Sequence, residues 1–368
     1  MSTHSSYSDS GRPLSSQIVS LETLIYVGLS SAKANELWVR WSNWPPTGPR
    51  RETDPDDGFG YTVTFLDFII GGYSVENTVD TAAEDDLEWR RCLDACGINT
   101  ATQDTIMDPK FRKLRLSNSC LYRARDTIEM RYKGLENLQQ QSTAGIEADV
   151  WGSPNAIAAL DAPGYTTLYK AMDQARIARL FDQSGAVSRI ETLLTSAPSD
   201  SSGTRSLFYF TPDHAVAEYH AAYAKRRAYY ASIVIICLRI PNAEIETLAP
   251  PDIQRIFFPS NEWKELVWRS RTRRPLPPHL KKYREATLVV GTTACKADLV
   301  YDRMKTWEEI TEENVFRVGK AGQENGAIQY VFSGEEDGHE FLTQHARGVK
   351  VFPYPPAALE EFLANASW

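Results

Sequence analysis

Apolar residues in the N-terminal part of the chain recur mainly at helical spacing. Ile128, Leu135 and Leu138 fall on one face of a helix that the pattern predicts over residues 121–141. A second stretch of helical patterning covers residues 82–96. These two stretches predict that the N-terminal part of the protein is mainly α-helical.

Two other features complete the N-terminal pattern. Residues 20–30, SLETLIYVGLS, predict a strand or a short helix, and residues 45–60 predict a long loop because they are rich in Pro, Gly and Asp. Large aromatic rings usually nucleate a core. The rings expected to do so here are Trp38, Trp41, Trp44 and Trp89.

The pattern changes after residue 164, where short runs rich in β-branched and aromatic residues alternate with helical segments. Helices are predicted over 173–180 and 213–227. The fold class expected from this mixture is α+β, with a mostly antiparallel or mixed sheet in the C-terminal half. The predicted strands lie within residues 165–172, 205–211, 231–240, 286–292 and 327–333.

Low-complexity segments set the expected domain boundaries. The first residues are polar and rich in Ser, and the segment before residue 165 is rich in Gln, Ala, Gly, Ser and Pro. The predicted organisation is a disordered head (1–18), a helical domain (19–141), a linker (142–164), an α+β domain (165–357) and a C-terminal tail (358–368).

Composition narrows the class of protein. The 368 residues suit two domains, and the formal net charge of −8 argues against a binder whose whole surface is basic. The five cysteines are scattered, which favours a reducing compartment over a disulfide scaffold or a zinc site. The longest apolar run, residues 231–238, is too short to span a bilayer. We therefore expect a cytoplasmic protein that uses no membrane and no metal.

One basic segment stands out against the acidic background. Residues 263–284 interleave cations with aromatic rings and contain three prolines, which indicate a stiff exposed loop. Basic side chains neutralise phosphates and aromatic faces stack on unpaired bases, so an RNA end such as a tRNA acceptor stem is one candidate partner. The alternative is a basic loop paired with the domain's own acids. The candidate tRNA-binding residues are Trp268, Arg269, Arg271, Arg273, Arg274, Lys281, Lys282 and Arg284.

Two pairs of carboxylates in the helical part have the spacing i, i+3. Asp85 with Glu88, and Asp126 with Glu129, can each direct two carboxylates to one side of a helix. Such a pair could hold a guanidinium through charge-assisted hydrogen bonds. The alternatives are a helix start whose acids complement the dipole, for the first pair, and a solvated stripe of ion pairs, for the second.

The C-terminal half resembles a divergent ADP-ribosyltransferase-like domain. The resemblance rests on the order TTLYKAMD, LFYFTPDHAVAEYHAAYAKRR, IVIICLRIPN, LVVGTTACKADLVY and IQYVFSGEEDGHEFL. It implies that Lys170, Tyr209, Thr211 and Gln329 line one cleft for NAD. Lys170 stands where the family has His or Arg, and Gln329 cannot act as a carboxylate, so the scaffold is expected more than the NAD chemistry.

The whole chain is similar to the fungal arginine-containing cyclodipeptide synthases. The similarity lies in LIYVGLSSAKANELWVRWSNWP, TQDTIMDPKFRKLRL and DTIEMRYKGLENLQ. It implies an essential motif of the form Asp-Asp-x-x-Glu, which Glu84-Asp85-x-x-Glu88 and Arg125-Asp126-x-x-Glu129 each match except at the first position. It also implies aminoacyl-tRNA partners, arginyl-tRNA among them, and no cofactor.

Three functions follow as expectations. The first is a tRNA-dependent enzyme of secondary metabolism that joins arginine and a second amino acid into a diketopiperazine. The second is an NAD-using ADP-ribosyltransferase or NAD hydrolase, and the third is a catalytically inactive module that binds RNA or protein. The reaction needs a general base, for which His214 and His220 are candidates, although such histidines are more often surface or core residues.

Overall fold

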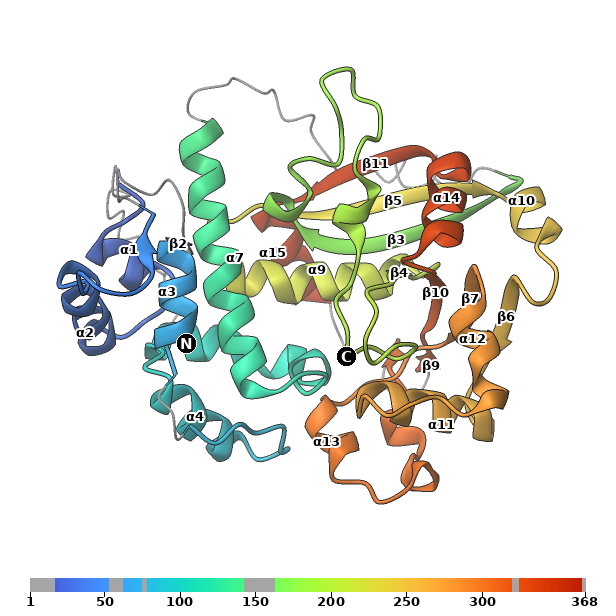
Figure 1. Ribbon diagram of the computed structural model, residues 1–368, viewed down its shortest axis with the longest axis horizontal. Coiled ribbons are helices and arrows are strands. Elements are labelled where there is room, and N and C mark those ends of the chain that lie inside the picture. Colours follow the sequence, from blue (N-terminus) through green and yellow to red (C-terminus); the bar gives the residue numbers. More distant parts are fainter. Residues whose placement is uncertain (1–16, 53–61, 75–77, 142–162, 320–323, 366–368) are drawn as a thin grey trace, which may run out of the picture.

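A computed structural model describes residues 17–52, 62–74, 78–141, 163–319 and 324–365 (Figure 1). The head and the linker predicted from the sequence lie outside these residues, except for two residues of each. The two halves that the linker connects are both described, and each contains the type of structure that the sequence predicts.

The N-terminal half is mainly helical, as predicted. Residues 20–30 contain the short helix α1, and the patterns over 82–96 and 121–141 correspond to α4 and α7. Several of these helices begin at a side-chain cap, such as Ser20, Ser30 and Thr64, which accepts a hydrogen bond from an otherwise unpaired backbone N–H. The helices are α1 (Leu21–Tyr26), α2 (Ser31–Ser42), α3 (Phe65–Gly72), α4 (Asp86–Ala95), α5 (Thr100–Ile106), η1 (Pro109–Phe111), α6 (Arg112–Arg115) and α7 (Cys120–Gln141), with two parallel strands, β1 (Arg50–Arg51) and β2 (Thr62–Val63).

The C-terminal half contains two main sheets and confirms the α+β class. One sheet has the strand order β11-β5-β3 and the other the order β4-β10-β7-β6. Neighbouring strands are antiparallel except β6 and β7, which run parallel. The strands are β3 (Tyr165–Asp173), β4 (Phe208–Phe210), β5 (Ile233–Pro241), β6 (Ile253–Ile256), β7 (Leu288–Thr292), β10 (Ile328–Phe332) and β11 (Arg347–Tyr354), with a small pair formed by β8 (Arg317–Val318) and β9 (Asn325–Gly326).

Helices surround these sheets. The helix predicted over 213–227 is α9, whereas the one predicted over 173–180 is only the short 3-10 helix η2. The helices of this half are η2 (Gln174–Ile177), η3 (Ile190–Leu193), α9 (His214–Ala228), α10 (Asn242–Thr247), α11 (Asn261–Arg271), η4 (Pro278–Leu280), α12 (Lys281–Glu285), α13 (Asp298–Asp302), η5 (Trp307–Glu309), η6 (Glu312–Asn314), α14 (Glu336–His345) and α15 (Pro356–Asn365).

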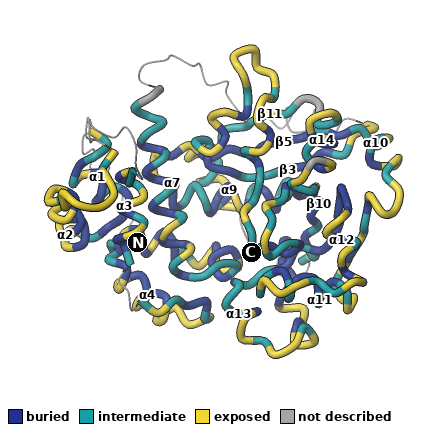
Figure 2. Tube along the Cα trace, viewed as in Figure 1, coloured by how far each residue is buried: buried dark blue, intermediate teal, exposed yellow. Residues whose placement is uncertain are grey.

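The three-stranded sheet is buried on both faces, which explains why β5 is almost uniformly apolar. Successive side chains of a strand point to opposite faces. Ile235 and Cys237 therefore pack with α9, while Ile236 and Leu238 pack toward the four-stranded sheet. Figure 2 shows this central region as mainly dark blue, with exposed residues concentrated in the peripheral loops.

The last helix belongs to the same core. The segment predicted as a C-terminal tail begins within α15, whose buried Phe362 stacks against the rings of Phe111 and Tyr219, with centroids 6.0 and 6.1 Å apart. Residues 366–368 lie outside the described part of the chain. Helix α15 thus contributes apolar surface to the core around α9.

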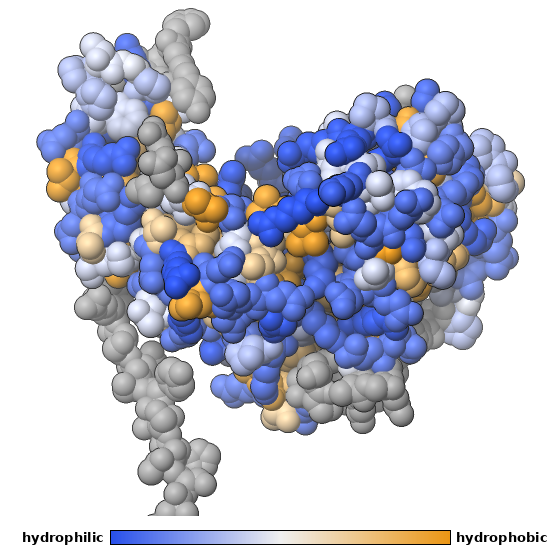
Figure 3. All heavy atoms as spheres, turned by 90° about the horizontal axis from the view of Figure 1, so that it is seen from below, coloured by the Kyte–Doolittle hydropathy of each residue, from blue (hydrophilic) through white to orange (hydrophobic). Residues whose placement is uncertain are grey.

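The two halves contact each other through α9 and through surface ion pairs. The Tyr223 hydroxyl of α9 donates to the Ile106 carbonyl oxygen at 3.0 Å, and Lys296 pairs with Glu84 at 2.7 Å. Seen from below, polar side chains cover most of the molecule, and several apolar ones show near the hollow between the N-terminal and C-terminal parts (Figure 3).

Candidate functional site

A buried carboxylate, Asp200, lies at the centre of the most connected polar cluster of the C-terminal half. One oxygen, Oδ1, accepts from Nε and Nη2 of Arg271 at 2.9 and 2.6 Å. The other, Oδ2, accepts from the Ala294 backbone N–H at 2.8 Å and from Gln329 Nε2 at 3.2 Å. Four donors therefore surround a side chain that is only 5% exposed.

Arg271 ends helix α11 and bridges two acids. Besides Asp200, its Nη1 donates to Asp298 Oδ1 at 3.0 Å. Burial raises the pKa of Asp298, and the neighbouring Arg271 guanidinium partly offsets that rise. Arg271 was a candidate tRNA contact, but its charge is already balanced by two carboxylates inside the protein. Its contacts fit the alternative that the basic segment pairs with the domain's own acids.

Tyr209 and Gln329, two residues of the expected NAD cleft, meet at the Asp200 loop. They lie on neighbouring strands, since Tyr209 of β4 pairs with Val331 of β10. The Tyr209 hydroxyl donates to Ser199 Oγ at 2.7 Å and accepts from the Ser201 backbone N–H at 3.0 Å. Burial raises the pKa of Tyr209 to about 12, so its hydroxyl stays protonated at neutral pH. Tyr209 thus holds the loop that carries Asp200.

Lys170 lies on the other side of the sheet. Its Nζ donates to the Leu193 carbonyl oxygen and to Thr195 Oγ1, both at 2.7 Å, and lies 5.7 Å from the centre of the Phe210 ring. Since Phe210 and Tyr209 are successive residues of one strand, their side chains point to opposite faces. The structure therefore does not bring Lys170 together with Tyr209 and Gln329.

Thr211 has a structural position between the two sheets. It exchanges two backbone hydrogen bonds with Tyr169 of β3, at 2.7 and 3.0 Å, and its hydroxyl accepts from the Asp213 backbone N–H. This bridge connects β3 to the segment that follows β4 and precedes α9. Of the four residues expected to line one cleft, only Tyr209 and Gln329 share a site.

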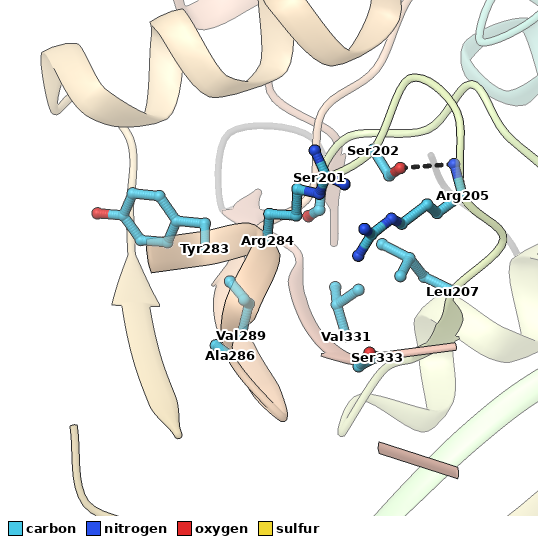
Figure 4. A pocket seen from close by; sticks show the side chains of 10 residues that line it. All are labelled: Ser201, Ser202, Arg205, Leu207, Tyr283, Arg284, Ala286, Val289, Val331 and Ser333. Carbon is cyan, nitrogen blue, oxygen red and sulfur yellow. Dashed lines mark hydrogen bonds between the residues drawn. The ribbon is translucent and has the colours of Figure 1, made fainter. Parts of the chain in front are cut away.

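A small pocket opens beside the Asp200 loop (Figure 4). The side chains of Arg205 and Arg284 extend into it from opposite walls, and the hydroxyl groups around them come from Ser201, Ser202 and Ser333. The empty space between the lining side chains, open solvent included, is about 340 Å³. Arg205 Nη1 also donates to Glu335 Oε2 at 2.6 Å, so Arg284 is the pocket's guanidinium without a carboxylate partner among the described residues. This guanidinium and the three hydroxyls give the pocket the chemistry to bind a phosphate or another anion.

A second, smaller hollow adjoins this pocket from the protein interior. Asp200 and Gln329 line it together with apolar side chains from α11, among them Trp263. Ser201, Val289 and Val331 line both spaces. The anion pocket at the surface and the buried Asp200 cluster are therefore neighbours, separated by only one layer of side chains.

The rest of the basic segment is divided between paired and unpaired cations. Arg269 donates to Glu265 at 2.7 Å, and Lys282 pairs with Glu262 at 3.0 Å. Arg274 lies over the Trp268 ring, with its guanidinium carbon 4.2 Å from the ring centre. Within the described part of the chain, no hydrogen bond or ion pair holds the exposed side chains of Arg273, Lys281 and Arg284. These cations remain available to a ligand.

The carboxylates of the second acidic pair have separate partners. Asp126 accepts from Arg227 of α9 at 2.7 Å, whereas Glu129 accepts from Arg125 one turn earlier in α7, at 2.6 Å. Arg227 is only 4% exposed, while Arg125 is 57% exposed. The pair does not form one joint guanidinium site in this structure.

The first acidic pair is engaged in local structure. Asp85 is the N-cap of α4 and accepts from the Leu87 backbone N–H at 2.9 Å. Glu88 accepts from the Thr81 hydroxyl at 3.1 Å. These contacts fit the alternative in which acids at a helix start serve the helix itself.

The two candidate bases lie on α9, away from the pocket lining. The His214 ring packs edge-on against Tyr169, with centroids 5.2 Å apart, and burial lowers the pKa of His214. The His220 ring lies 5.6 Å from that of Phe316. Neither histidine belongs to the residues that line the anion pocket or the Asp200 hollow.

Sequence reasoning missed the residues that organise this site. Asp200, Ser201 and Arg205 lie in a loop, and Asp298 begins a helix of five residues, so no periodic pattern marks any of them. The one available signal was the segment SDSSGTRS before a predicted strand, whose turn chemistry indicates a structured loop.

Comparisons of the chain with protein-family models, with curated proteins and with solved structures found no match. Among the described residues, no helix is long and apolar enough to cross a bilayer. In the same part of the chain, no three or more His, Cys, Asp or Glu side chains are grouped so that they could hold a metal ion. The candidate site therefore rests on the geometry given above.

Proposed function

We propose that the protein binds the end of an RNA at the pocket between Arg205 and Arg284, as part of a tRNA-dependent synthesis of an arginine-containing cyclic dipeptide. The observation that carries the RNA-binding part is the anion pocket itself, with unpaired Arg273 and Lys281 nearby in sequence. Phosphate groups fit a guanidinium with hydroxyl groups around it, as Arg284 and the serines of the pocket provide. The Trp268 ring is only 5% exposed and lies under Arg274, so this candidate tRNA contact offers no face to an unpaired base.

The arrangement of the strands supports an ADP-ribosyltransferase-like scaffold for this site. The first strand of the half, β3, contacts the aromatic strand β4 through Tyr169 and Thr211, and β4 leads directly into α9. The late strand β10, which carries Gln329, pairs with β4. The order of these three strands along the chain is the one on which the resemblance rests.

The proposed reaction requires a bound ester rather than a cofactor. The α-amino group of one aminoacyl residue attacks the ester carbonyl of the other, so that a C–N bond forms and the C–O bond to a tRNA hydroxyl breaks. A second attack of the same kind closes the ring and releases the second tRNA. The pocket would hold tRNA phosphates, while the choice of arginine comes from the resemblance to the synthase family.

Expression in a tRNA-rich host followed by mass spectrometry of the culture tests the enzymatic part. An arginine-containing diketopiperazine that disappears in Arg284→Ala, but persists in the control Arg91→Ala on α4, is the expected result. Absence of any such product would contradict the synthase. Retention of tRNA binding without a product would instead favour a non-catalytic RNA-binding module.

The NAD-using alternative has one supporting observation, the placement of Tyr209 and Gln329 on neighbouring strands. Both side chains are occupied by the Asp200 loop, so NAD would have to displace this loop. Calorimetric titration with NAD separates the two candidates. Saturable binding that is lost in Gln329→Ala would favour NAD chemistry, and no heat of binding would remove it.

A further inference from the structure

The donors around Asp200 form a preorganised set for one oxyanion. Two N–H groups of Arg271 approach one carboxylate oxygen, and the Ala294 N–H and Gln329 Nε2 approach the other. The donors come from α11, from the segment after β7 and from β10. Three separate elements of the scaffold thus converge on a carboxylate that a loop supplies.

The loop that carries Asp200 is held by hydrogen bonds within itself and by the Tyr209 hydroxyl. Ser199 donates its backbone N–H to the Ser202 carbonyl oxygen at 2.8 Å, and Arg205 donates its own to Ser202 Oγ at 2.8 Å. At Gly203 the loop lies against the end of α11, where a Cβ atom would be 2.8 Å from the Ser270 carbonyl oxygen. These hydrogen bonds and the two to Tyr209 do not involve the Asp200 carboxylate, so the loop stays attached to the scaffold but loosens when Asp200 leaves the donors.

If Asp200 leaves the donors, the positive charge of Arg271 favours binding of another anion in its place. Without Asp200, Arg271 would keep only Asp298 as a counter-charge, and the Ala294 N–H would be buried without a partner. Gln329 Nε2 would keep only its 3.4 Å hydrogen bond to the Thr292 carbonyl oxygen. The anion pocket lies next to these donors, because Ser201, Val289 and Val331 line both spaces. An anion bound in the outer pocket would therefore lie close to the inner donors.

We propose that Arg271, the Ala294 N–H and Gln329 form a binding site for a small oxyanion, which Asp200 fills in the free protein and which an external carboxylate or phosphate occupies by displacing Asp200. Asp200 is in this respect an internal competitor of the ligand. The proposal concerns the inner donors and does not depend on whether the outer pocket binds RNA.

The first test uses the full chain with Asp200→Ala and titrates acetate and inorganic phosphate by calorimetry. We expect saturable binding of one anion per chain, with a Kd at least about tenfold lower than that of the unsubstituted protein. Asp298→Ala is the matched control, because it removes a carboxylate from Arg271 without emptying the donor set. Tighter binding of acetate would indicate a carboxylate ligand, and tighter binding of phosphate a phosphate ester.

If Asp200→Ala does not fold, hydrogen exchange of the unsubstituted protein tests the proposal. Hydrogen exchange of residues 198–206 in the unsubstituted chain should become faster as phosphate or acetate is added. If neither anion changes the exchange rate, Asp200 stays paired with Arg271 and the proposal is wrong. Equal anion affinity of Asp200→Ala and the unsubstituted protein would overturn the proposal in the same way.

Discussion

Asp126 of α7 and Arg227 of α9 form an ion pair, with 2.7 Å between Oδ2 and Nη1, at the junction of the two halves. Arg227 also donates to Thr127 Oγ1 and stacks on the Tyr223 ring. Burial raises the pKa of the Asp126 carboxyl, but Arg227 and Arg123 outweigh burial and hold it below its ordinary value. Asp126 therefore acts as a counter-charge for buried arginines.

Substitution of Asp126 by Ala should destabilise the protein. It would leave Arg227 buried without a carboxylate, and we expect a loss of about 2–4 kcal/mol in the free energy of unfolding. Glu129→Ala, which breaks an exposed pair on the same helix, should cost less than about 0.5 kcal/mol. Urea denaturation of the two variants measures the difference.

A different result would indicate that Asp126 and Glu129 bind a guanidinium together, as the sequence suggested. If Asp126→Ala and Glu129→Ala both kept the stability of the unsubstituted protein and both abolished product formation, the two carboxylates would share a ligand. The conservative variant Asp126→Asn separates charge from shape, because the amide retains most of the side-chain volume.

Gly134 marks the closest approach of α7 to the segment after α9. A Cβ atom at this position would lie 2.4 Å from the Ala231 Cβ and 2.9 Å from its Cα. Gly134→Ala should therefore destabilise by about 1–3 kcal/mol, although alanine is the better helix former. Gly71→Ala in α3 is the control, because no atom lies within 4 Å of its Cβ. Thermal unfolding should show the control unchanged or slightly more stable.

Lys170 should make stability depend on pH above neutrality. Burial, with a smaller effect of Arg176, lowers the pKa of Lys170 from 10.5 to about 7. Between pH 7 and 10.5 the folded state has lost this proton while the unfolded state still holds it, so stability rises with pH in this window. The difference in unfolding free energy between the unsubstituted protein and Lys170→Met should change across the window, and a constant difference would contradict this role.

The paired and unpaired cations of residues 263–284 should respond differently to substitution. Arg273→Ala and Lys281→Ala remove exposed charges, so each should reduce the salt dependence of RNA binding by about 0.7–0.9 in slope while leaving the melting temperature unchanged. Arg271→Ala should instead leave the buried Asp200 carboxylate without its counter-charge and lower the free energy of unfolding by about 3 kcal/mol or more. Filter binding at several salt concentrations and thermal unfolding distinguish these outcomes. RNA binding that does not depend on Arg273 or Lys281 would exclude these two cations from the interface.

Periodic patterns predicted several of the longer elements. The helices α4, α7 and α9 and the strands β3, β5, β7 and β10 occupy the residues that the sequence indicates. These elements bury one face or both, so their side chains repeat at intervals that can be read along the chain. Other elements were not predicted, and the predicted helix over 173–180 is only one short turn. The larger elements missed are α2, α3, α5, α11, α14, α15, β6 and β11.

The candidate site depended on the tertiary structure. The sequence correctly marked residues 263–284 as basic, and composition alone established the acidic background. It could not decide which cations are free, because Arg271 and Arg273 look alike in sequence, whereas only Arg271 meets a carboxylate 71 residues away. Asp200 gains its four donors from three distant elements, and no local pattern encodes such a convergence. Local periodicity determined the elements, and long-range packing decided which charged groups pair and which remain open to a ligand.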